Sequence, residues 1–443
     1  MKAKRKRMEY AMNYEEARAY LEESKRYGGE IGLGKIYALL EELDHPEDDL
    51  QFVHIAGTNG KGSVLAYVST TMTLAGYRVG RYISPTLYSY EERFQVDGVP
   101  ITKEDYVTHM EYIAKAVARM EARGLSMPSP FEIETVLAFL YFKSKHCDLV
   151  VLECGLGGLL DATNVIKNTK VAVLTSISMD HMEYLGDTLG DIATNKSGII
   201  KPLAQVVTTK QETEAEVSIR NKCLESGNNL MIADYTTAVS LSSDWHGQKF
   251  SYENEVYEVS LPGVPQIQNA TLAIEVLHAL QACGYTLTEE QIKAGLKAAV
   301  WNGRFTILRE KPYFLVDGAH NPDAAQKFVK SLQNCFPERR IIYIIGMLKD
   351  KAYEEVIRIT APLASQIIAM ETPDNDRALP AAKLAEAIRS YHPQVQTASS
   401  MPSAVHMSME LAGPEDVIAA FGSLSFIGDI TKIVKDYEEK END

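Results

Sequence analysis

Residues 52–68 read FVHIAGTNGKGSVLAYV, and this stretch decides the fold of the N-terminal half of the chain. An apolar run at 52–56 leads into a glycine-rich segment, and a second apolar run follows it. This order predicts a strand, a tight loop and a helix that begins at Lys61. Glycines let the loop backbone approach a ligand closely, and the N–H groups at a helix start attract anions. We therefore predict that the loop binds phosphate.

The spacing within this loop departs from the common phosphate-loop pattern, G-x-x-x-x-G-K-[ST]. Gly62 separates Lys61 from Ser63, and Ile55 stands where the first glycine of that pattern would fall. A plain strand–helix turn is the alternative, but the glycines, the lysine and the hydroxyl in this context favour phosphate. We expect the Ser63 hydroxyl to bind Mg²⁺. The residues expected to hold the nucleotide are Gly57, Thr58, Asn59, Gly60, Lys61, Gly62 and Ser63.

Short apolar runs alternate with helical periodicity along the whole chain, which predicts an α/β fold. We expect an N-terminal P-loop mononucleotide-binding domain over 1–300, with a mostly parallel sheet. Residues 236–260 alternate with a period near two and predict a small antiparallel sheet. A second strand–helix series predicts a C-terminal Rossmann-like α/β domain over 301–443. The expected strands are 52–56, 79–83, 149–153, 171–176, 205–208, 313–316, 341–345, 366–369 and 417–420.

Charged side chains follow two further strands of the N-terminal part. Glu153 ends one strand, Asp180 and His181 follow another, and Lys196 lies on the next helix. Ligands of open α/β sheets bind beyond the carboxyl ends of the strands, so Glu153 should face the same crevice as the loop. A carboxylate there can hold Mg²⁺ against nucleotide phosphates. The residues alone leave open an ordinary salt bridge for Glu153 and packed or solvated positions for His181 and Lys196.

The second half carries its own polar motifs, WNGRF at 301–305 and DGAHNP at 317–322. Arg304 can clamp phosphate charge, and Asp317 at a strand end can bind ribose hydroxyls. A turn that caps a helix from Pro322 is the alternative for the second motif.

Taken together and in this order, these segments resemble the Mur ligase superfamily, and within it the folylpolyglutamate synthase/dihydrofolate synthase family. The resemblance spans nearly the whole chain, from Met12 to Leu424. The motifs that carry it are AGTNGKGS (56–63), ISPTL (83–87), ERFQVDG (92–98), ECGLGG (153–158), DATN (161–164), SMDHMEYLG (178–186), NKSGI (195–199), QNA (268–270), WNGRF, DGAHNP and GSLSFIGD (422–429).

The resemblance implies an ATP-dependent amide ligase that adds L-glutamate to a folate through an acyl phosphate. It also implies two Mg²⁺ sites, one held by Ser84 and Glu153 and a second held by His181. Lys196 matches a lysine that the family carbamylates with CO₂.

For ATP, the resemblance implies binding by Asn269, Arg304 and Asp317, with the last two reaching over from the C-terminal domain. His320 matches a motif residue close to this site. Together with Lys61, Glu153, His181 and Lys196, His320 completes the expected catalytic set.

Four positions depart from the family pattern. Leu159 stands where Arg is usual, Asn195 where Glu precedes the lysine, Thr86 where His is frequent, and Pro265 where His precedes Gln266. Leu159 and Thr86 bear on folate binding or metal-site support, and Asn195 bears on the carbamylation of Lys196. None of them replaces a residue assigned to the phosphates.

The charge, the cysteines and the apolar runs of the sequence limit the kinds of binding partner and location that we expect. The net charge of −15 argues against a nucleic acid as the main ligand. Five cysteines without a Cys-x-x-Cys pair predict reduced thiols in the cytoplasm, and no apolar run approaches membrane-spanning length. We expect a cytoplasmic monomer, as is usual for the family, whose partners are ATP, L-glutamate and a folate or dihydropteroate.

Two alternatives remain from the sequence. A dihydrofolate synthase, or an enzyme with both activities, would add the first glutamate to dihydropteroate. A nucleotide-binding module without ligase chemistry would need the phosphate loop but not Glu153, His181, Arg304 and Asp317.

Overall fold

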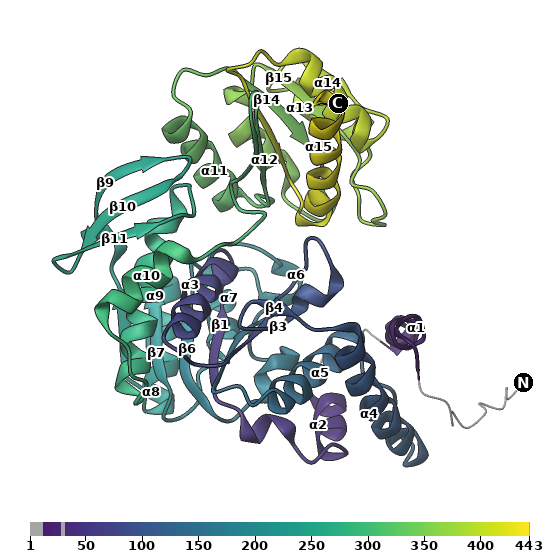
Figure 1. Ribbon diagram of the computed structural model, residues 1–443, viewed down its shortest axis with the longest axis vertical. Helices are drawn as coiled ribbons and strands as arrows, with labels where there is room; N and C mark the ends of the chain where they lie inside the picture. Colours follow the sequence, from purple (N-terminus) through teal and green to yellow (C-terminus); the bar gives the residue numbers. More distant parts are fainter. Residues whose placement is uncertain (1–11, 28–31, 443) are drawn as a thin grey trace, which may run out of the picture.

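The computed structural model describes residues 12–27 and 32–442, which form two α/β domains stacked along the long axis of the molecule (Figure 1). The N-terminal domain is built on an eight-stranded sheet of order β4-β3-β2-β5-β1-β6-β7-β8. The C-terminal domain is built on a six-stranded sheet of order β12-β13-β17-β14-β15-β16. The predicted α/β class with mostly parallel sheets is confirmed.

Strand β1 (Phe52–Ala56) lies at the centre of the N-terminal sheet and pairs in parallel with β5 and β6. All five of its residues are buried, as expected for a parallel strand covered by helices on both faces. The antiparallel hairpin of β3 and β4 closes one edge and was not predicted. The other strands are β2 (Val79–Tyr82), β3 (Phe94–Val96), β4 (Val99–Pro100), β5 (Leu149–Glu153), β6 (Thr169–Leu174), β7 (Gln205–Thr209) and β8 (Leu230–Ala233).

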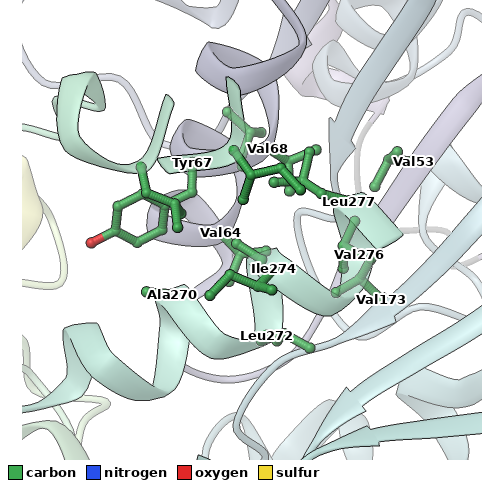
Figure 2. Close-up of a cluster of buried hydrophobic side chains, with 14 of the residues drawn as sticks. Val53, Val64, Tyr67, Val68, Val173, Ala270, Leu272, Ile274, Val276 and Leu277 are labelled. Carbon is green, nitrogen blue, oxygen red and sulfur yellow. The ribbon is translucent and has the colours of Figure 1, made fainter. Parts of the chain in front are cut away.

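Helix α3 (Lys61–Leu74) follows the glycine-rich loop and is buried on nearly all sides, because it lies between the sheet and two further helices. Val64, Tyr67 and Val68 pack with Val53 of β1 and with Leu277 of α9 in one apolar cluster (Figure 2). This packing fixes the start of α3 against the end of β1. The helices of this face are α3, α9 (Pro265–Ala282) and α10 (Glu289–Ala298).

The opposite face and the far edge of the sheet are covered by the remaining N-terminal helices. The first group packs on Phe52, Tyr82, Val150 and Leu152, and the second packs on Ala172 and Leu174. The first group is α1 (Tyr14–Ser24), α2 (Gly34–Glu41), α4 (Lys103–Ala122) and α5 (Pro130–Ser144); the second is α6 (Met182–Leu185), α7 (Leu189–Ser197) and α8 (Thr213–Ser226).

The predicted antiparallel sheet consists of β9 (Val239–Asp244), β10 (Gly247–Tyr252) and β11 (Glu255–Val259). Figure 1 shows it at one side, between the two domains. Phe250 and Tyr257 pack into the cluster around α3 and α9, while the ring of Trp245 lies 5.6 Å from that of Tyr313. This small sheet therefore contacts both domains.

In the C-terminal domain, β13, β17, β14, β15 and β16 are parallel, and β12 (Thr306–Glu310) pairs antiparallel to β13. Neither β12, β16 nor the last helix was predicted. The other elements are β13 (Tyr313–Asp317), α11 (Pro322–Cys335), β14 (Ile341–Ile345), α12 (Tyr353–Thr360), β15 (Gln366–Ala369), α13 (Ala381–Arg389), β16 (Val395–Thr397), α14 (Met401–Leu411), β17 (Val417–Phe421) and α15 (Ile427–Asn442).

Each predicted strand is present, with ends that lie within two residues of the predicted ones. Within the described part of the chain, no helix has the length and apolar character needed to cross a bilayer.

Candidate active site

Two cavities lie between the domains, and they share Asn59 and Arg304. The larger has a volume of about 300 Å³ and the smaller about 70 Å³. The predicted site residues around the larger cavity are Gly57, Thr58, Asn59, Lys61, Ser84, Glu153, His181, Lys196, Arg304 and His320. Those around the smaller cavity are Asn59, Gly60, Ser63, Asn269, Arg304 and Asp317.

The glycine-rich loop has a backbone that side chains would not allow. Gly57 has φ 150° and Gly60 has φ 95°. A Cβ at Gly57 would lie 1.8 Å from Thr175 Oγ1, and one at Gly60 would lie 2.4 Å from Asn269 Oδ1. The backbone N–H groups of Thr58 and Asn59 donate to the Ser176 carbonyl at 2.8 and 3.2 Å. The loop is thus held between β6 and α9.

Gly62, the residue that breaks the common spacing, packs beneath Trp301. An added Cβ at Gly62 would lie 2.3 Å from Cζ2 of the Trp301 ring. Trp301 belongs to the segment between α10 and β12, which enters the C-terminal domain. The extra glycine therefore lets this connecting segment lie directly on the first turn of α3.

Lys61 and Glu153 face each other at the floor of the larger cavity. Lys61 Nζ lies 4.0 Å from Glu153 Oε1 and donates to the carbonyls of Gly57 and Thr58 at 3.2 and 3.3 Å. Burial raises the pKa of Glu153 above its usual value, and the Lys61 ammonium partly offsets this effect. Polyphosphate bound here would give the Lys61 ammonium a stronger anionic partner.

Lys196 is almost completely buried, with 5% of its surface exposed. Its Nζ donates to the Gly57 carbonyl at 3.0 Å, so two lysines approach the same loop carbonyl. Burial, and then the positive charge of Lys61, lower the pKa of Lys196 to about 7. A substantial fraction of this amine is therefore uncharged near neutral pH.

Asp180 and His181, at the end of the segment after β6, meet side chains of the C-terminal domain. Lys351 Nζ donates to Asp180 Oδ1 at 2.7 Å, and His320 Nε2 lies 3.6 Å from Asp180 Oδ2. Burial opposes ionisation of Asp180, but His320 and the Lys351 ammonium outweigh it and hold its pKa far below the usual value. For His181, burial disfavours the charged imidazolium and is the main cause that lowers its pKa, to about 4. His181 is therefore neutral near pH 7.

The smaller cavity is bordered by a chain of polar side chains. Asn269 Nδ2 donates to Gln266 Oε1 at 3.3 Å, and Gln266 Nε2 donates to Ser63 Oγ at 3.4 Å. Both carboxylate oxygens of Asp317 accept backbone N–H groups, from Phe305 at 2.8 Å and from Ala319 at 2.7 Å. Asp317 thus holds the backbone at Phe305 and at Ala319 as well as lining the cavity.

A third cavity of about 310 Å³ adjoins the larger one at Leu156, which lines both. Apolar and aromatic side chains dominate its walls, and Leu160 and Tyr184 are exposed there. Asp161 and Asn195 add polar groups. The other residues around it are Gly32, Ser129, Phe131, Glu132, Ala162 and Leu185.

The donors around Glu153 suit a hard divalent cation. Mg²⁺ takes carboxylate and hydroxyl oxygens and keeps water or phosphate oxygens at its other positions, so Glu153 with Ser84 fits it. His181 offers a ring nitrogen, but its Nε2 lies 3.3 Å from Lys351 Nζ in this structure. Within the described residues, the compact triads of His, Cys, Asp and Glu lie elsewhere, at His45/Glu47/Asp48 and Glu253/Glu275/His278.

Sequence reasoning did not include Lys351 or Arg377, which line the larger cavity from the C-terminal side. A signal was available, because Lys351 follows the strand at 341–345, as Asp317 follows its own strand. Asp180 follows a strand in the sequence, but the motif does not show that its carboxylate pairs with Lys351. Ser423 and Ser425, in the motif after β17, also line this cavity.

Comparison with known families matches residues 55–277 to the Mur ligase middle domain and residues 303–424 to the Mur ligase glutamate ligase domain. The fold and the site between its two sheets thus define a ligase of the Mur type.

The relatives narrow the class further. The dihydrofolate synthase/folylpolyglutamate synthase of Bacillus subtilis is 34% identical, over 95% of this chain and 99% of the relative. A Mycobacterium tuberculosis folylpolyglutamate synthase complexed with ADP and AMPPCP has a TM-score of 0.86 at 29% identity, over 95% of this chain and 99% of that one. Escherichia coli FolC in complex with DHPP and ADP has a TM-score of 0.85 at 29% identity, over 97% and 99%. The chain belongs to the folylpolyglutamate synthase/dihydrofolate synthase family of Mur ligases.

Proposed function

We propose that this chain uses ATP to join L-glutamate to the carboxylate of a folate. The observation that carries the proposal is the convergence of the phosphate loop, Glu153 and Lys196 with Arg304 and His320 on one cavity between two domains. Bringing ATP to a carboxylate sets anion against anion, so cations from both walls are needed.

In the proposed reaction, the folate carboxylate attacks the γ-phosphorus of ATP, and ADP leaves. The amine of glutamate then attacks the carbonyl carbon of the acyl phosphate, and inorganic phosphate leaves. Lys61 and the backbone N–H groups of residues 60–63 hold the β- and γ-phosphates, while Arg304 approaches them from the opposite wall. Enclosure between the domains protects the acyl phosphate from water.

Asn269, Arg304 and Asp317 are proposed to bind the nucleotide from the smaller cavity. Glu153 and Ser84 would hold one Mg²⁺ and His181 a second, with Ser63 close to the phosphates. Bound Mg²⁺ neutralises developing phosphate charge. His320, with its Nδ1 2.8 Å from the Gly318 carbonyl, contributes to the wall that faces the incoming amino acid.

The third cavity is proposed to hold the aromatic part of the acceptor. Its mostly apolar and aromatic walls suit a pterin ring, and Glu132, whose buried Oε1 has no hydrogen-bond partner in the described structure, can fix the orientation of the ring. Leu156 marks the passage to the larger cavity, where the acceptor carboxylate would meet ATP. Leu160, which lines the third cavity, adds an exposed apolar side chain to it.

Lys196 is proposed to take up CO₂ as a carbamate. The uncharged amine that this reaction requires is supported by the lowered pKa of Lys196. Intact mass measured with and without bicarbonate should reveal the addition of one CO₂, and Lys196→Met should abolish it. Full activity of Lys196→Ala would argue against any role for this lysine.

We further propose the domain limits 1–300 and 301–443, with Trp301 at the boundary. A single chain supplies both walls of the cavity, which supports action as a monomer.

The cysteines support a cytoplasmic location, because all of them are free thiols: Cys147, Cys154, Cys223, Cys283 and Cys335.

The test is phosphate release by purified protein given ATP, Mg²⁺ and L-glutamate, with dihydropteroate and tetrahydrofolate in separate reactions. Release that depends on glutamate and tetrahydrofolate supports the polyglutamate activity. Release with dihydropteroate supports dihydrofolate synthesis, the activity that comes first in the name of the Bacillus subtilis relative. No release with either acceptor would overturn the proposal.

A further inference from the structure

Lys351 reaches out of the C-terminal domain and lies against two side chains of the N-terminal domain. Its Nζ is 2.7 Å from Asp180 Oδ1 and 3.3 Å from His181 Nε2. The side chains of Lys351 and Asp180 are only 9% and 10% exposed. An ammonium group thus sits between a carboxylate oxygen and a ring nitrogen at a junction of two domains.

The direction of these contacts is fixed by their chemistry. An ammonium group has three donors and no acceptor, so His181 Nε2 must present its lone pair to Lys351. A divalent metal would use the same lone pair and the same carboxylate oxygen. Asp180 Oδ1 and His181 Nε2 are 3.8 Å apart, a span that two ligands at about 2.0–2.2 Å from one ion can bridge.

The other oxygen of Asp180 is held separately. Asn321 Nδ2 donates to Asp180 Oδ2 at 3.3 Å, and His320 Nε2 approaches the same oxygen. These contacts orient the carboxylate, while Oδ1 accepts the backbone N–H of His181 at 2.9 Å and offers its other lone pair to Lys351 or to a metal ion. We propose that the Lys351 ammonium is a tethered cation that occupies the position of a divalent ion between Asp180 and His181, so that metal binding there requires its displacement. This inference rests on the proposed metal role of His181.

Displacement has a structural consequence. Lys351 lies just beyond β14 at the mouth of the larger cavity, so its release would turn a cation toward the cavity and free this contact between the domains. Metal arrival and the opening of the C-terminal wall would then be linked. Asp180 would serve as a further ligand of the second ion.

The test is a titration of nucleotide-free, full-length protein with Mn²⁺. The electron paramagnetic resonance signal of the unbound ion measures how much Mn²⁺ the protein has bound. Lys351→Met removes the charge and keeps most of the length of the side chain. We expect it to bind Mn²⁺ about tenfold more tightly or better, because a neighbouring positive charge no longer competes. Lys351→Arg should stay close to wild type.

Lys349→Met is the matched control, because Lys349 lies two residues away, is exposed and donates to the Asp376 carbonyl instead. Its Mn²⁺ affinity should be unchanged. Adding His181→Ala or Asp180→Asn to Lys351→Met should remove the gain. Thermal unfolding of each variant identifies any loss of fold, and Lys351→Gln provides a second neutral side chain.

Failure of the proposed Lys351 role can be distinguished from failure of the proposed ligase activity. Unchanged or weaker Mn²⁺ binding by both neutral variants would overturn the inference, even if ligase activity is present. If His181→Ala leaves Mn²⁺ binding to the nucleotide complex unchanged, the metal role of His181 fails, and the inference fails with it. Glutamate-dependent phosphate release by wild-type protein is measured independently of both.

Discussion

Both sheets present the carboxyl ends of their parallel strands to the two cavities between the domains, but they use these ends differently. In the N-terminal domain, β1 leads into the glycine-rich loop and β5 ends at Glu153, and both the loop and the Glu153 side chain line the larger cavity. In the C-terminal domain, β13 ends at Asp317, which gives both oxygens to backbone N–H groups. The N-terminal edge therefore presents charged side chains to the cavity, whereas the C-terminal edge uses the carboxylate of Asp317 to hold its own backbone.

This difference shows that the position of a charged residue at the end of a strand does not by itself determine its functional role. The N-terminal groups lie at the floor of a preformed loop, while the C-terminal groups Arg304, His320 and Lys351 extend across the gap between domains. We expect substitutions on the first edge to act mainly on the chemical step. Substitutions on the second edge should act more on binding and stability.

Lys61→Ala is the change with the largest expected effect. Loss of this ammonium beside the transferred phosphate should lower kcat by about 10²–10³-fold, as for other groups that stabilise transition-state charge. Arg304→Ala should raise the KM for ATP more than it lowers kcat. Steady-state kinetics of both variants test this contrast, and near-normal turnover by Lys61→Ala would break it.

Burial of Lys196 in the N-terminal domain should make the free energy of unfolding depend on pH. The pKa of Lys196 falls from 10.5 to about 7 on folding, so below about 7 the folded and unfolded states are both protonated and the full cost of burial applies. Between these values only the unfolded chain keeps the proton. The unfolding free energy should therefore rise by about 1.4 kcal/mol per pH unit.

Denaturant titrations of wild type and Lys196→Met between pH 7 and 9, in CO₂-free buffer, measure the unfolding free energy of each protein. The difference between their pH dependences is the contribution of Lys196. Lys196→Met should lack the rise. Equal slopes for the two proteins would show that Lys196 keeps its proton when buried.

Asp317→Asn probes the C-terminal edge. An amide accepts at one atom only, so the N–H of Phe305 or Ala319 loses its partner, at a cost of about 1–3 kcal/mol in unfolding free energy. We expect a higher KM for ATP and a smaller loss of kcat than for Lys61→Ala. A kcat loss as large as that of Lys61→Ala, with stability unchanged, would make the two edges equivalent.

The smallest expected effect concerns a contact between the edges. Asn59 Nδ2 donates to Asp323 Oδ2 at 2.8 Å across the domain junction, and Lys327 binds the same oxygen at 2.9 Å. Asp323→Ala should change the unfolding free energy by less than about 1 kcal/mol, because the pair is partly exposed. A larger loss, measured by urea unfolding, would mean that the domains depend on this contact.

Much of the fold could be predicted because the parallel strands are continuous apolar runs bounded by glycine or charge. Strand β1 and helix α3 were found with their ends nearly correct, since Gly57 and Gly60 interrupt both patterns. The hairpin of β3 and β4 was missed because its strands have only three and two residues. Strand β12 was missed because its partly exposed side chains show no alternation.

Of the site, the residues within the recognised motifs could be predicted, Arg304 and His320 of the C-terminal part included, but the pairs that form between the two domains could not. Lys351 lies 171 residues from Asp180 in the sequence, and nothing in a single sequence shows that they pair. The role of Gln266 between Ser63 and Asn269 depends in the same way on how α9 packs against α3.

The contact of Trp301 with Gly62 makes the identity of one residue depend on the other. Any side chain at position 62 collides with the indole ring, so a larger residue there becomes acceptable only once position 301 has become smaller. The two positions should therefore vary together among homologues, and Gly62→Ala should be less damaging in a Trp301→Leu background than alone. The segment that joins the domains and the proposed phosphate-binding loop would then be inherited as one unit.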